Sequence, residues 1–271
     1  MIKIAGSGSW AGTMLLVVLL GGQGVQAQNS GGDTAAHYKL YSVLYQRKAA
    51  EYRALCYQAY TLAERRLKEE ILIAKKRNPK RKLAIITDLD ETALDNSDYY
   101  AEQLLLGREY DGESWKAFTA LGKAKAVPGA VSFFKTADLN KVRIAYLSNR
   151  KTDELVGTLA NLRALGFPQA DSAHLLLKTT TSSKEERRRS LQAQGYEVLL
   201  LLGDNLNDFE QEFEKQDMAT RAATTDRKQA LFGRRYIVLP NAIYGEWEDA
   251  LTDYKRLEGA ERKAKLKQNL Q

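Results

Sequence analysis

Three acidic side chains lie within four residues at the end of an apolar run. Asp88, Asp90 and Glu91 follow the segment LAIIT, and Asp95 comes shortly after them in the stretch DLDETALDN. Carboxylates this close repel one another, and the end of a buried strand offers little water to relieve the repulsion. Either a cation neutralises them, or the stretch is an acidic loop. A hard divalent ion such as Mg²⁺ would suit the first alternative, because it takes carboxylate and phosphate oxygens as ligands.

A second pair of aspartates follows another apolar run, EVLLLLGD. Asp204 ends this run and Asp208 stands four residues later, which is one turn of a helix. Gly203 would let the chain turn close to an ion. A carboxylate nucleophile beside a metal indicates phosphoryl transfer through an acyl-phosphate. In that chemistry Asp90 is suited to protonate the leaving alcohol and then to activate water.

Polar residues near other strand ends can donate hydrogen bonds to a phosphate. Ser148 and the backbone amides near Asn149 follow an apolar run, and Lys184 lies at the expected start of a helix. A lysine there adds its charge to the N–H groups of the helix terminus. Arg150 is as well suited to a structural ion pair as to contact with substrate.

The elements that must position these residues alternate along the chain. Apolar runs with a strong strand preference occupy 83–88, 142–149, 173–177, 197–204 and 236–240, and helical segments occupy 128–137, 153–166, 182–195 and 208–223. This alternation is typical of an α/β fold with a central parallel sheet covered on both faces. Because ligands bind beyond the carboxyl ends of parallel strands, the tips TDLD, LSNR and LGDN are predicted to form one site.

The rest of the chain suggests a domain plan around this core. We predict a linker at 28–33, an N-terminal helical region at 34–79 with a helix to about residue 77, a core at 80–250, and a basic C-terminal helix at 251–271. The segment 96–127 is long for a connection, amphipathic and rich in aromatic residues. We expect it to form a small helical cap over the first strand tip.

Residues 1–27 have the plan of a secretory signal peptide. Lys3 precedes the apolar run MLLVVLL, and Val25 and Ala27 supply the small residues of a cleavage site after Ala27. We expect a periplasmic or secreted protein without a stable membrane span after cleavage; an uncleaved anchor is the alternative. No cysteine stands at the cleavage point for a lipid, and the single cysteine, Cys56, has no partner for an intramolecular disulfide.

Composition excludes several classes of function. The net charge of +7 would suit an anionic substrate, but its excess gathers in two helical tracts, KKRNPKRK and ERKAKLKQ, without interleaved aromatics. We therefore expect a small-molecule phosphomonoester as partner and no nucleic-acid polymer. The chain has two histidines and no RHG, GxxxxGK[ST] or HExxH sequence, which excludes histidine phosphatases, nucleotide triphosphatases of the P-loop type and zinc proteases.

Four motifs in order resemble those of haloacid-dehalogenase-like phosphatases: DLDET (88–92), SNR (148–150), Lys184 in SSKE, and GDNLND (203–208). More narrowly, the chain is similar to the secreted class C acid phosphatases of the DDDD phosphohydrolase group. The similarity runs from residue 50 to residue 251. It implies a three-layer fold with sheet order 5-4-1-2-3 when the strands are numbered along the chain, the strand at 83–88 in the centre, and a smaller α-helical domain or cap.

The resemblance also implies roles for individual residues. Asp88 would be the nucleophile and Asp90 the acid and base, and one Mg²⁺ would be held by the Asp88 carboxylate, the Asp90 backbone carbonyl and Asp204. Asp208 would orient metal-bound water or Lys184. The phosphate would be held by Thr92, Ser148, Asn149 and Lys184. The leaving nucleoside would meet Asp95 and Asn96 near its sugar and stack on Trp115 and Tyr244.

These features favour a secreted, Mg²⁺-dependent acid phosphatase acting on nucleoside 5′-monophosphates through an aspartyl-phosphate. One alternative keeps the fold and changes the substrate, to a broad-specificity or sugar-phosphate phosphatase whose aromatic residues only pack. Another is a nucleotide-binding protein without catalysis. We also allow for a homodimer. Glu91 is expected to be structural.

Overall fold

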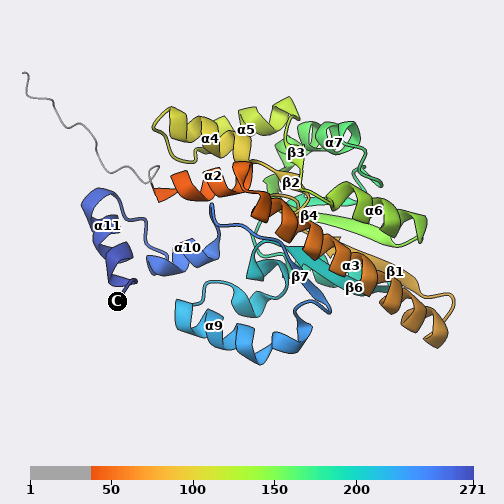
Figure 1. Cartoon of the computed structure of the whole chain (residues 1–271). Helices are drawn as coiled ribbons and strands as arrows, with labels where there is room; N and C mark the ends of the chain where they lie inside the picture. Colours follow the sequence, from red (N-terminus) through yellow and green to blue (C-terminus); the bar gives the residue numbers. More distant parts are fainter. Residues whose placement is uncertain (1–37) are drawn as a thin grey trace, which may run out of the picture. The chain divides into compact units, whose positions relative to one another are not determined.

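A five-stranded parallel sheet organises the described part of the chain, residues 38–271 of a computed structural model (Figure 1). The predicted signal peptide and linker lie outside the described residues. The strands are β1 (Lys82–Thr87), β4 (Arg143–Lys151), β5 (Leu175–Lys178), β6 (Tyr196–Gly203) and β7 (Tyr236–Val238). They are ordered β5-β4-β1-β6-β7. Numbered along the chain, this is the order 5-4-1-2-3 with the first strand central, so the predicted fold class is confirmed.

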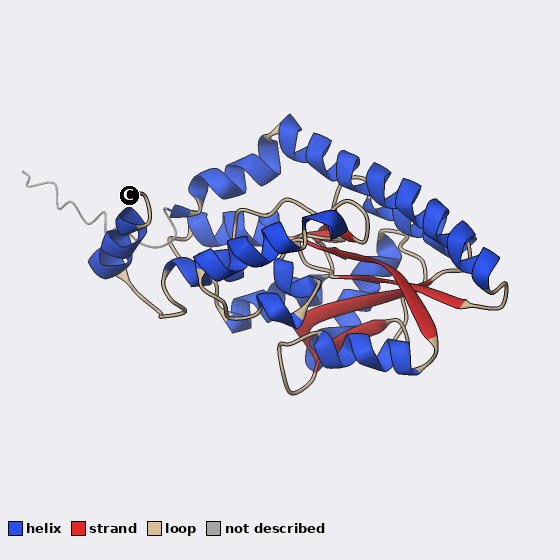
Figure 2. Ribbon diagram, turned by 90° about the horizontal axis from the view of Figure 1, so that it is seen from below, coloured by secondary structure: helices blue, strands red, loops and turns tan. Residues whose placement is uncertain are grey.

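Helices cover both faces of the sheet (Figure 2). Alternate residues of β1 face opposite sides: Leu83 and Ile85 belong to one apolar cluster, and Ile86 belongs to another. The first cluster is closed by α3 (Ala50–Arg77), α6 (Ala130–Leu139) and α7 (Leu155–Ala164), and the second by α8 (Glu185–Ala193) together with the segment 206–236. Burial on both faces explains why these strands are apolar along nearly their whole length.

The predicted N-terminal helix is divided in two. Helix α2 (Leu40–Lys48) ends where Ala49 adopts an extended conformation with ψ of 130°, and α3 begins at the next residue. Helix α3 packs along the sheet, whereas Val43 of α2 packs with aromatic residues from the segment after β1. Because of this break, the apolar side chains of α2 and of α3 pack against two separate surfaces.

The segment between β1 and α6 contains two helices, α4 (Ser97–Leu105) and α5 (Gly112–Leu121). Its ends are joined by a short antiparallel pair, β2 (Leu94–Asp95) with β3 (Lys125–Ala126). Asp111 caps α5 by accepting hydrogen bonds from the first turn of the helix. These elements lie where a cap was predicted, and the boundaries of that cap as a domain stay a prediction.

The helices that follow β6 differ from those expected from the sequence. The prediction of a continuous helix over 208–223 was wrong. Two 3₁₀ turns, at Leu206–Asp208 and Gln211–Phe213, precede α9 (Met218–Arg227). Asp217 caps α9 through its side chain, which explains the later start. Two further helices follow, α10 (Glu246–Leu251) and α11 (Gly259–Gln268). Within residues 38–271, no helix has the length and apolar character needed to cross a membrane.

Candidate active site

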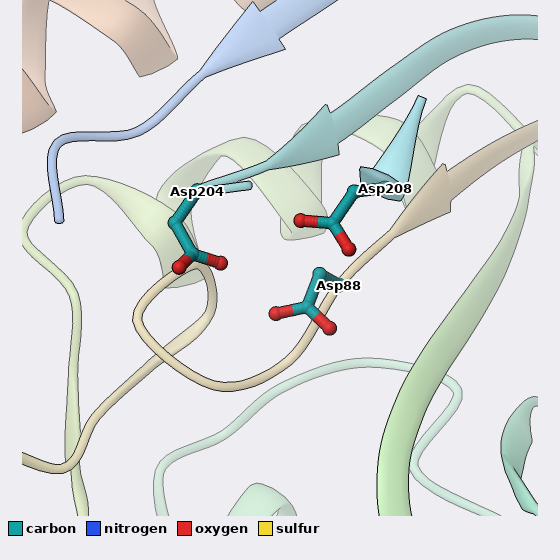
Figure 3. Close-up of side chains that lie close together, drawn as sticks. All are labelled: Asp88, Asp204 and Asp208. Atoms are coloured by element: carbon teal, nitrogen blue, oxygen red, sulfur yellow. The ribbon is translucent and has the colours of Figure 1, made fainter. Parts of the chain in front are cut away.

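Three aspartates form what we call the acidic centre: Asp88, Asp204 and Asp208 (Figure 3). Asp88 follows the end of β1 and Asp204 follows the end of the neighbouring strand β6. One carboxylate oxygen from each lies within 4.8 Å of the other two. Parallel strands that end at the same edge thus bring together aspartates more than a hundred residues apart, as the strand tips predicted.

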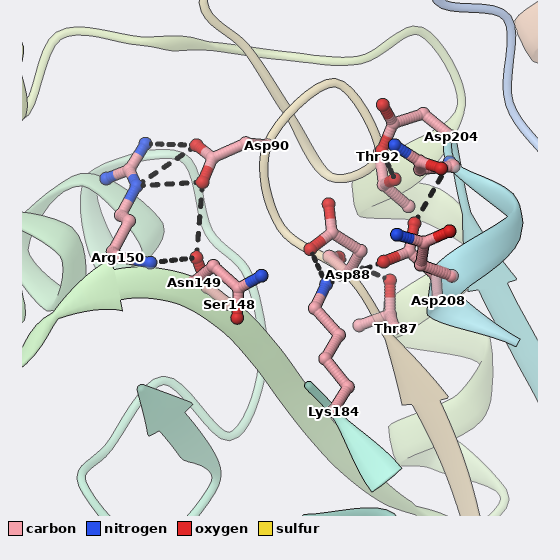
Figure 4. Close-up of polar contacts among 12 residues, drawn as sticks. Thr87, Asp88, Asp90, Thr92, Ser148, Asn149, Arg150, Lys184, Asp204 and Asp208 are labelled. Carbon is pink, nitrogen blue, oxygen red and sulfur yellow. Dashed lines mark hydrogen bonds and ion pairs between the residues drawn. The ribbon is translucent and has the colours of Figure 1, made fainter. Parts of the chain in front are cut away.

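Lys184 connects two members of this centre (Figure 4). Its ammonium group donates to the Asp88 carboxylate and, over 2.8 Å, to Asp208. It reaches them from the residue just before α8 and is 5% exposed. Burial lowers the pKa of Lys184, but Asp208 and Asp88 outweigh this effect and the pKa ends above its usual value. The lysine is therefore held as a cation against two carboxylates.

One ammonium group does not neutralise three carboxylates. Burial raises the pKa of Asp88 well above its ordinary value, with Asp208 and Asp204 adding to the rise and Lys184 opposing it. Burial and Asp208 raise the pKa of Asp204 to about 8. Both shifts mean that the charged carboxylates are unfavourable here without a further cation. An all-oxygen donor set of this size fits a hard divalent metal ion.

Gly203 allows Asp208 to enter the centre. A Cβ atom on residue 203 would lie 2.4 Å from the Asp208 side chain, so that a larger residue would push this aspartate away. Asp208 is further held by the backbone N–H of Asn205, which donates to its carboxylate over 3.0 Å. The turn is 3₁₀ rather than the expected α-helix. From the sequence, Gly203 was expected to let the chain turn close to an ion. In the structure it matters because the absence of a side chain leaves room for Asp208.

Asp204 has two side-chain donors. Thr92 donates to one carboxylate oxygen over 3.1 Å, and Asn241 donates to the other over 2.7 Å. The sequence reasoning missed Asn241, although it stands in LPNAI just after the last strand, where a polar residue at a strand tip was the available signal. Thr92 was expected to hold phosphate; here its hydroxyl orients Asp204.

Asp90 has surroundings unlike those of Asp88, although only one residue separates them. Two nitrogens of the Arg150 guanidinium donate to the same oxygen of the Asp90 carboxylate, over 2.7 and 3.0 Å. Asn96 donates to that oxygen over 2.9 Å, and Ser148 donates to the other over 3.2 Å. The Asp90 side chain is outside the acidic centre, so an Asp90 contribution to a metal would have to come from its backbone carbonyl, as the resemblance implied.

Arg150 makes the ion pair that the sequence left open. It is 3% exposed, its second terminal nitrogen donates to Thr158 over 3.0 Å, and its guanidinium lies 5.5 Å from the centre of the Trp115 ring. Asp90 raises the pKa of Arg150 against the opposing effect of burial. The arginine therefore remains charged and links the predicted acid and base to the predicted stacking residue.

A cavity of about 520 Å³ opens beside both groups of charges. Its lining includes most of the predicted site residues: Asp88, Asp90, Trp115, Asn149, Lys184, Asp204, Asp208 and Tyr244. Thr92 and Ser148 are fully buried behind this surface. Tyr100, which the sequence analysis did not single out, lies between the two predicted stacking residues, with its ring centre 5.2 Å from that of Tyr244 and 6.4 Å from that of Trp115.

Two predicted substrate contacts do not reach the cavity. Asn96 is fully buried and binds Asp90 and Glu91, and Asp95 accepts hydrogen bonds from Gln46 of α2 and from the Ser97 amide. Neither side chain lines the cavity. Both side chains hold the segment after β1 through internal hydrogen bonds, and their contact with a sugar stays a prediction.

Glu91 is a buried carboxylate next to Tyr244, one of the aromatic residues at the cavity. It is fully buried, has a left-handed backbone with φ of 58°, and accepts hydrogen bonds from the Asn96 amide and from the Tyr244 hydroxyl. Burial and Asp90 raise the pKa of Glu91 to about 8. These contacts agree with the structural role expected for it.

Comparison with known proteins assigns the family. The family model described as HAD superfamily, subfamily IIIB (acid phosphatase), matches residues 23–247. The chain belongs to this acid phosphatase family. It is therefore a phosphoric monoester hydrolase.

Two solved structures of the class C acid phosphatase from Bacillus anthracis are similar to this family member. One is 36% identical with a TM-score of 0.80 and covers 87% of this chain and 98% of its own. The other, with tungstate bound, is 35% identical with a TM-score of 0.79 and covers 87% and 97%. The chain is also 25% identical over 128 residues to the stem 31 kDa glycoprotein of Glycine max, in a match that spans 45% of this chain and half of the plant protein.

Proposed function

We propose that this acid phosphatase hydrolyses nucleoside 5′-monophosphates in a Mg²⁺-dependent reaction that forms an aspartyl-phosphate at Asp88. The observation that carries the proposal is the acidic centre, in which Lys184 donates to Asp88 and Asp208 and Asp204 lies close to both aspartates, all of them lining one cavity. A buried carboxylate beside a cation and open to a cavity is suited to attack a phosphoryl group.

The residues that would hold the metal are Asp88 and Asp204, with the backbone carbonyl of Asp90. When bound, Mg²⁺ supplies positive charge to the phosphoryl oxygens. Thr92 and Asn241 fix the orientation of the Asp204 carboxylate, and Asn205 fixes that of Asp208. Such supporting hydrogen bonds keep ligand oxygens in place while a substrate enters and leaves.

In the reaction, an Asp88 oxygen forms a bond to phosphorus as the bond to the leaving oxygen breaks. Lys184 balances the charge of the phosphoryl oxygens and keeps Asp88 ionised. Asn149, near the end of β4, lines the cavity across Asp88 from Asp208, where it can donate to phosphate, and Ser148 beside it holds Asp90. Asp90 gives a proton to the leaving alkoxide, and then takes one from the water that breaks the aspartyl-phosphate.

Proton transfer by Asp90 requires a movement of its side chain. In the present conformation its two oxygens accept hydrogen bonds from Arg150, Asn96 and Ser148. A carboxylate so fully bound has no free oxygen for a leaving group. We infer that Asp90 turns away from Arg150 to act, and that the arginine returns it to one position between turnovers.

The test of the nucleophile is Asp88→Asn. We expect kcat to fall by about 10³-fold or more, because the amide is not a nucleophile of comparable strength. Release of inorganic phosphate from p-nitrophenyl phosphate measures the loss, and circular dichroism checks the fold. A folded Asp88→Asn protein with full activity would overturn the mechanism.

The preference for nucleotides depends on the aromatic residues at the cavity. Trp115, Tyr100 and Tyr244 line the cavity, and base stacking on an aromatic side chain contributes about 1–3 kcal/mol per base. We expect Trp115→Ala to lower kcat/KM for 5′-AMP about tenfold more than for p-nitrophenyl phosphate. The corresponding comparison for Tyr244→Ala tests the second residue.

One observation favours the alternative of a broad-specificity phosphatase. The Tyr244 hydroxyl is bound to Glu91 and its ring packs on Tyr100, so this tyrosine has a structural role without any ligand. Equal losses on both substrates in the two alanine variants would support that alternative.

We further propose that the protein acts outside the inner membrane, after removal of residues 1–27. N-terminal sequencing of protein recovered from the periplasm or the medium tests this, with residue 28 expected first. Retention in the membrane fraction with an intact N-terminus would instead support the uncleaved anchor.

A further inference from the structure

The regular pairing between β4 and β5 is interrupted close to the candidate active site. Leu147 pairs with Leu176 of β5, and the next pair is Lys151 with Lys178. Strand β4 therefore advances four residues while β5 advances two, and Ser148, Asn149 and Arg150 bulge out between them. Bulges next to active sites redirect side chains and leave backbone groups without ladder partners.

Arg187 fills the gap that this bulge opens. One terminal nitrogen of its guanidinium donates to the carbonyls of Ser148, over 2.7 Å, and of Leu176, over 3.1 Å. The other donates to the Asn149 side chain, over 2.8 Å, and to the Ser183 carbonyl, over 3.3 Å. A single side chain thus connects the bulge of β4, the adjacent strand β5 and the residue that precedes Lys184.

These contacts orient groups that face the phosphate site. The carbonyl and N–H of a trans peptide point in opposite directions. Holding the Ser148 carbonyl on Arg187 therefore directs the Asn149 N–H away from the arginine. The hydrogen bond to the Asn149 side chain fixes the same residue a second time, and the bond to Ser183 restrains the loop that carries Lys184.

We propose that Arg187 is a positioning residue for phosphate binding, which holds the Ser148–Asn149 bulge and the Lys184 loop in one arrangement. The inference rests on the proposed phosphate-binding role of Ser148, Asn149 and Lys184. Arg187 does not line the cavity beside the acidic centre, so it acts through these residues rather than on the substrate.

The neighbouring arginines in the run ERRRS have different contacts, which supplies a matched control. Arg188 donates to the Asp208 carbonyl, over 2.9 Å, rather than to the bulge of β4. Arg189 is exposed and, within residues 38–271, pairs with Glu185 alone, on its own helix. Substitution of Arg189 thus removes the same charge from the same helix without touching the bulge.

The test compares Arg187→Met, Arg187→Lys and Arg189→Met. Methionine keeps an apolar stem and removes every donor, and lysine keeps the charge but replaces the fork by one ammonium group. We expect both Arg187 variants to raise KM, and the inhibition constant of inorganic phosphate, about tenfold or more, with a smaller change in kcat. Arg189→Met should stay within about twofold of the parent.

A purely structural role would give a different result. It predicts a lower melting temperature with an unchanged inhibition constant for phosphate in the folded fraction, and that outcome would overturn the proposal. Full rescue by Arg187→Lys would also overturn it, since charge alone would then suffice. The effect of Arg187→Met should shrink in an Asn149→Ala background, because one of its contacts is already lost. Additive effects would contradict positioning through Asn149.

The outcome is separable from that of the proposed mechanism. Phosphate inhibition reports binding of the anion, whereas Asp88→Asn reports covalent chemistry. Full activity of Asp88→Asn combined with a weakened phosphate affinity in Arg187→Met would reject the aspartyl-phosphate and retain the positioning role. Unchanged phosphate affinity in a folded Arg187→Met protein, with inactive Asp88→Asn, would do the reverse.

Discussion

Asp88 and Asp90 stand on one short loop but occupy opposite electrostatic environments (Figure 4). Asp88 lies close to two further carboxylates and shares the ammonium group of Lys184 with one of them, Asp208, and burial raises the pKa of Asp88. Around Asp90, a guanidinium and two other donors satisfy one carboxylate. The first centre lacks positive charge and the second does not. This difference teaches that neighbouring aspartates acquire separate roles from the elements that supply their partners, since Arg150 comes from β4 and Lys184 from the residue before α8.

After substitution of the nucleophile itself, the largest effect is expected from breaking the acidic centre at Asp204. We expect Asp204→Asn to lower kcat/KM by about 10²–10³-fold, because a proposed metal ligand loses its charge. The parent should lose activity in EDTA and recover it when Mg²⁺ is added back. Phosphate release at increasing Mg²⁺ concentration measures both effects.

The exposed Asp226 supplies the control for this experiment, since Asp226→Asn removes the same charge far from the proposed ligands. It should leave activity within about twofold of the parent. Activity of the parent that is insensitive to EDTA would remove the metal from the proposal.

Breaking the second centre at Arg150 should have the next largest effect. We expect Arg150→Met to reduce kcat about 10–100-fold, since Asp90 would no longer return to a single position. Removing one partner of a buried ion pair costs about 3–5 kcal/mol of unfolding free energy. Urea denaturation and kcat, measured on the same preparation, separate the two effects. Arg65→Met, which removes an exposed ion pair on α3, is the control and should change neither.

A substitution at Gly203 should have a smaller effect, because it displaces only Asp208 of the acidic centre. Gly203→Ala places a methyl group against the Asp208 side chain, and we expect a loss of about 1–3 kcal/mol in unfolding free energy. Gly112→Ala, at the first residue of α5 with nothing within 4 Å of the added Cβ, should be neutral or slightly stabilising. Thermal unfolding measures both. Equal stability of the two variants would contradict the close packing of Gly203 with Asp208.

The smallest effect on catalysis is expected at the edge of the second centre. Thr158→Val removes the acceptor of one Arg150 nitrogen while keeping the shape of the side chain. We expect a loss of about 1–3 kcal/mol in stability and a change in kcat of less than about threefold, because the contacts of Arg150 with Asp90 remain. A loss of kcat as large as that of Arg150→Met would mean that Thr158 orients the whole guanidinium.

Much of the acidic centre could be predicted from the sequence, because its residues follow apolar runs directly. Asp88 and Asp204 stand at the ends of strands, and parallel strands present their carboxyl ends at one edge. The residues that support the centre were harder to predict. Asn241 follows a strand that gives no acidic signal, and Arg187 stands in a run of three arginines whose sequence does not distinguish them.

Two predictions differ from the structure for a shared physical cause. Asp95 and Asn96 are polar and close to the nucleophile in sequence, which favoured a position at the cavity, but both make internal hydrogen bonds and neither lines it. The helix expected from residue 208 starts later because the side chain of Asp208 is held at the acidic centre and Asp217 supplies the cap. In each case a specific tertiary partner outweighed a local preference.

By itself, the sequence determined the parallel sheet, the family motifs and the convergence of Asp88, Asp204 and Asp208. These follow from hydrophobic periodicity and strand direction, which are local properties of the chain. Only the tertiary structure decided that Asp90 turns to Arg150, that Tyr100 stands between the predicted stacking residues, and that Arg187 fills the bulge of β4. Such contacts join residues far apart in the chain, and their geometry depends on how strands, bulges and helices pack together.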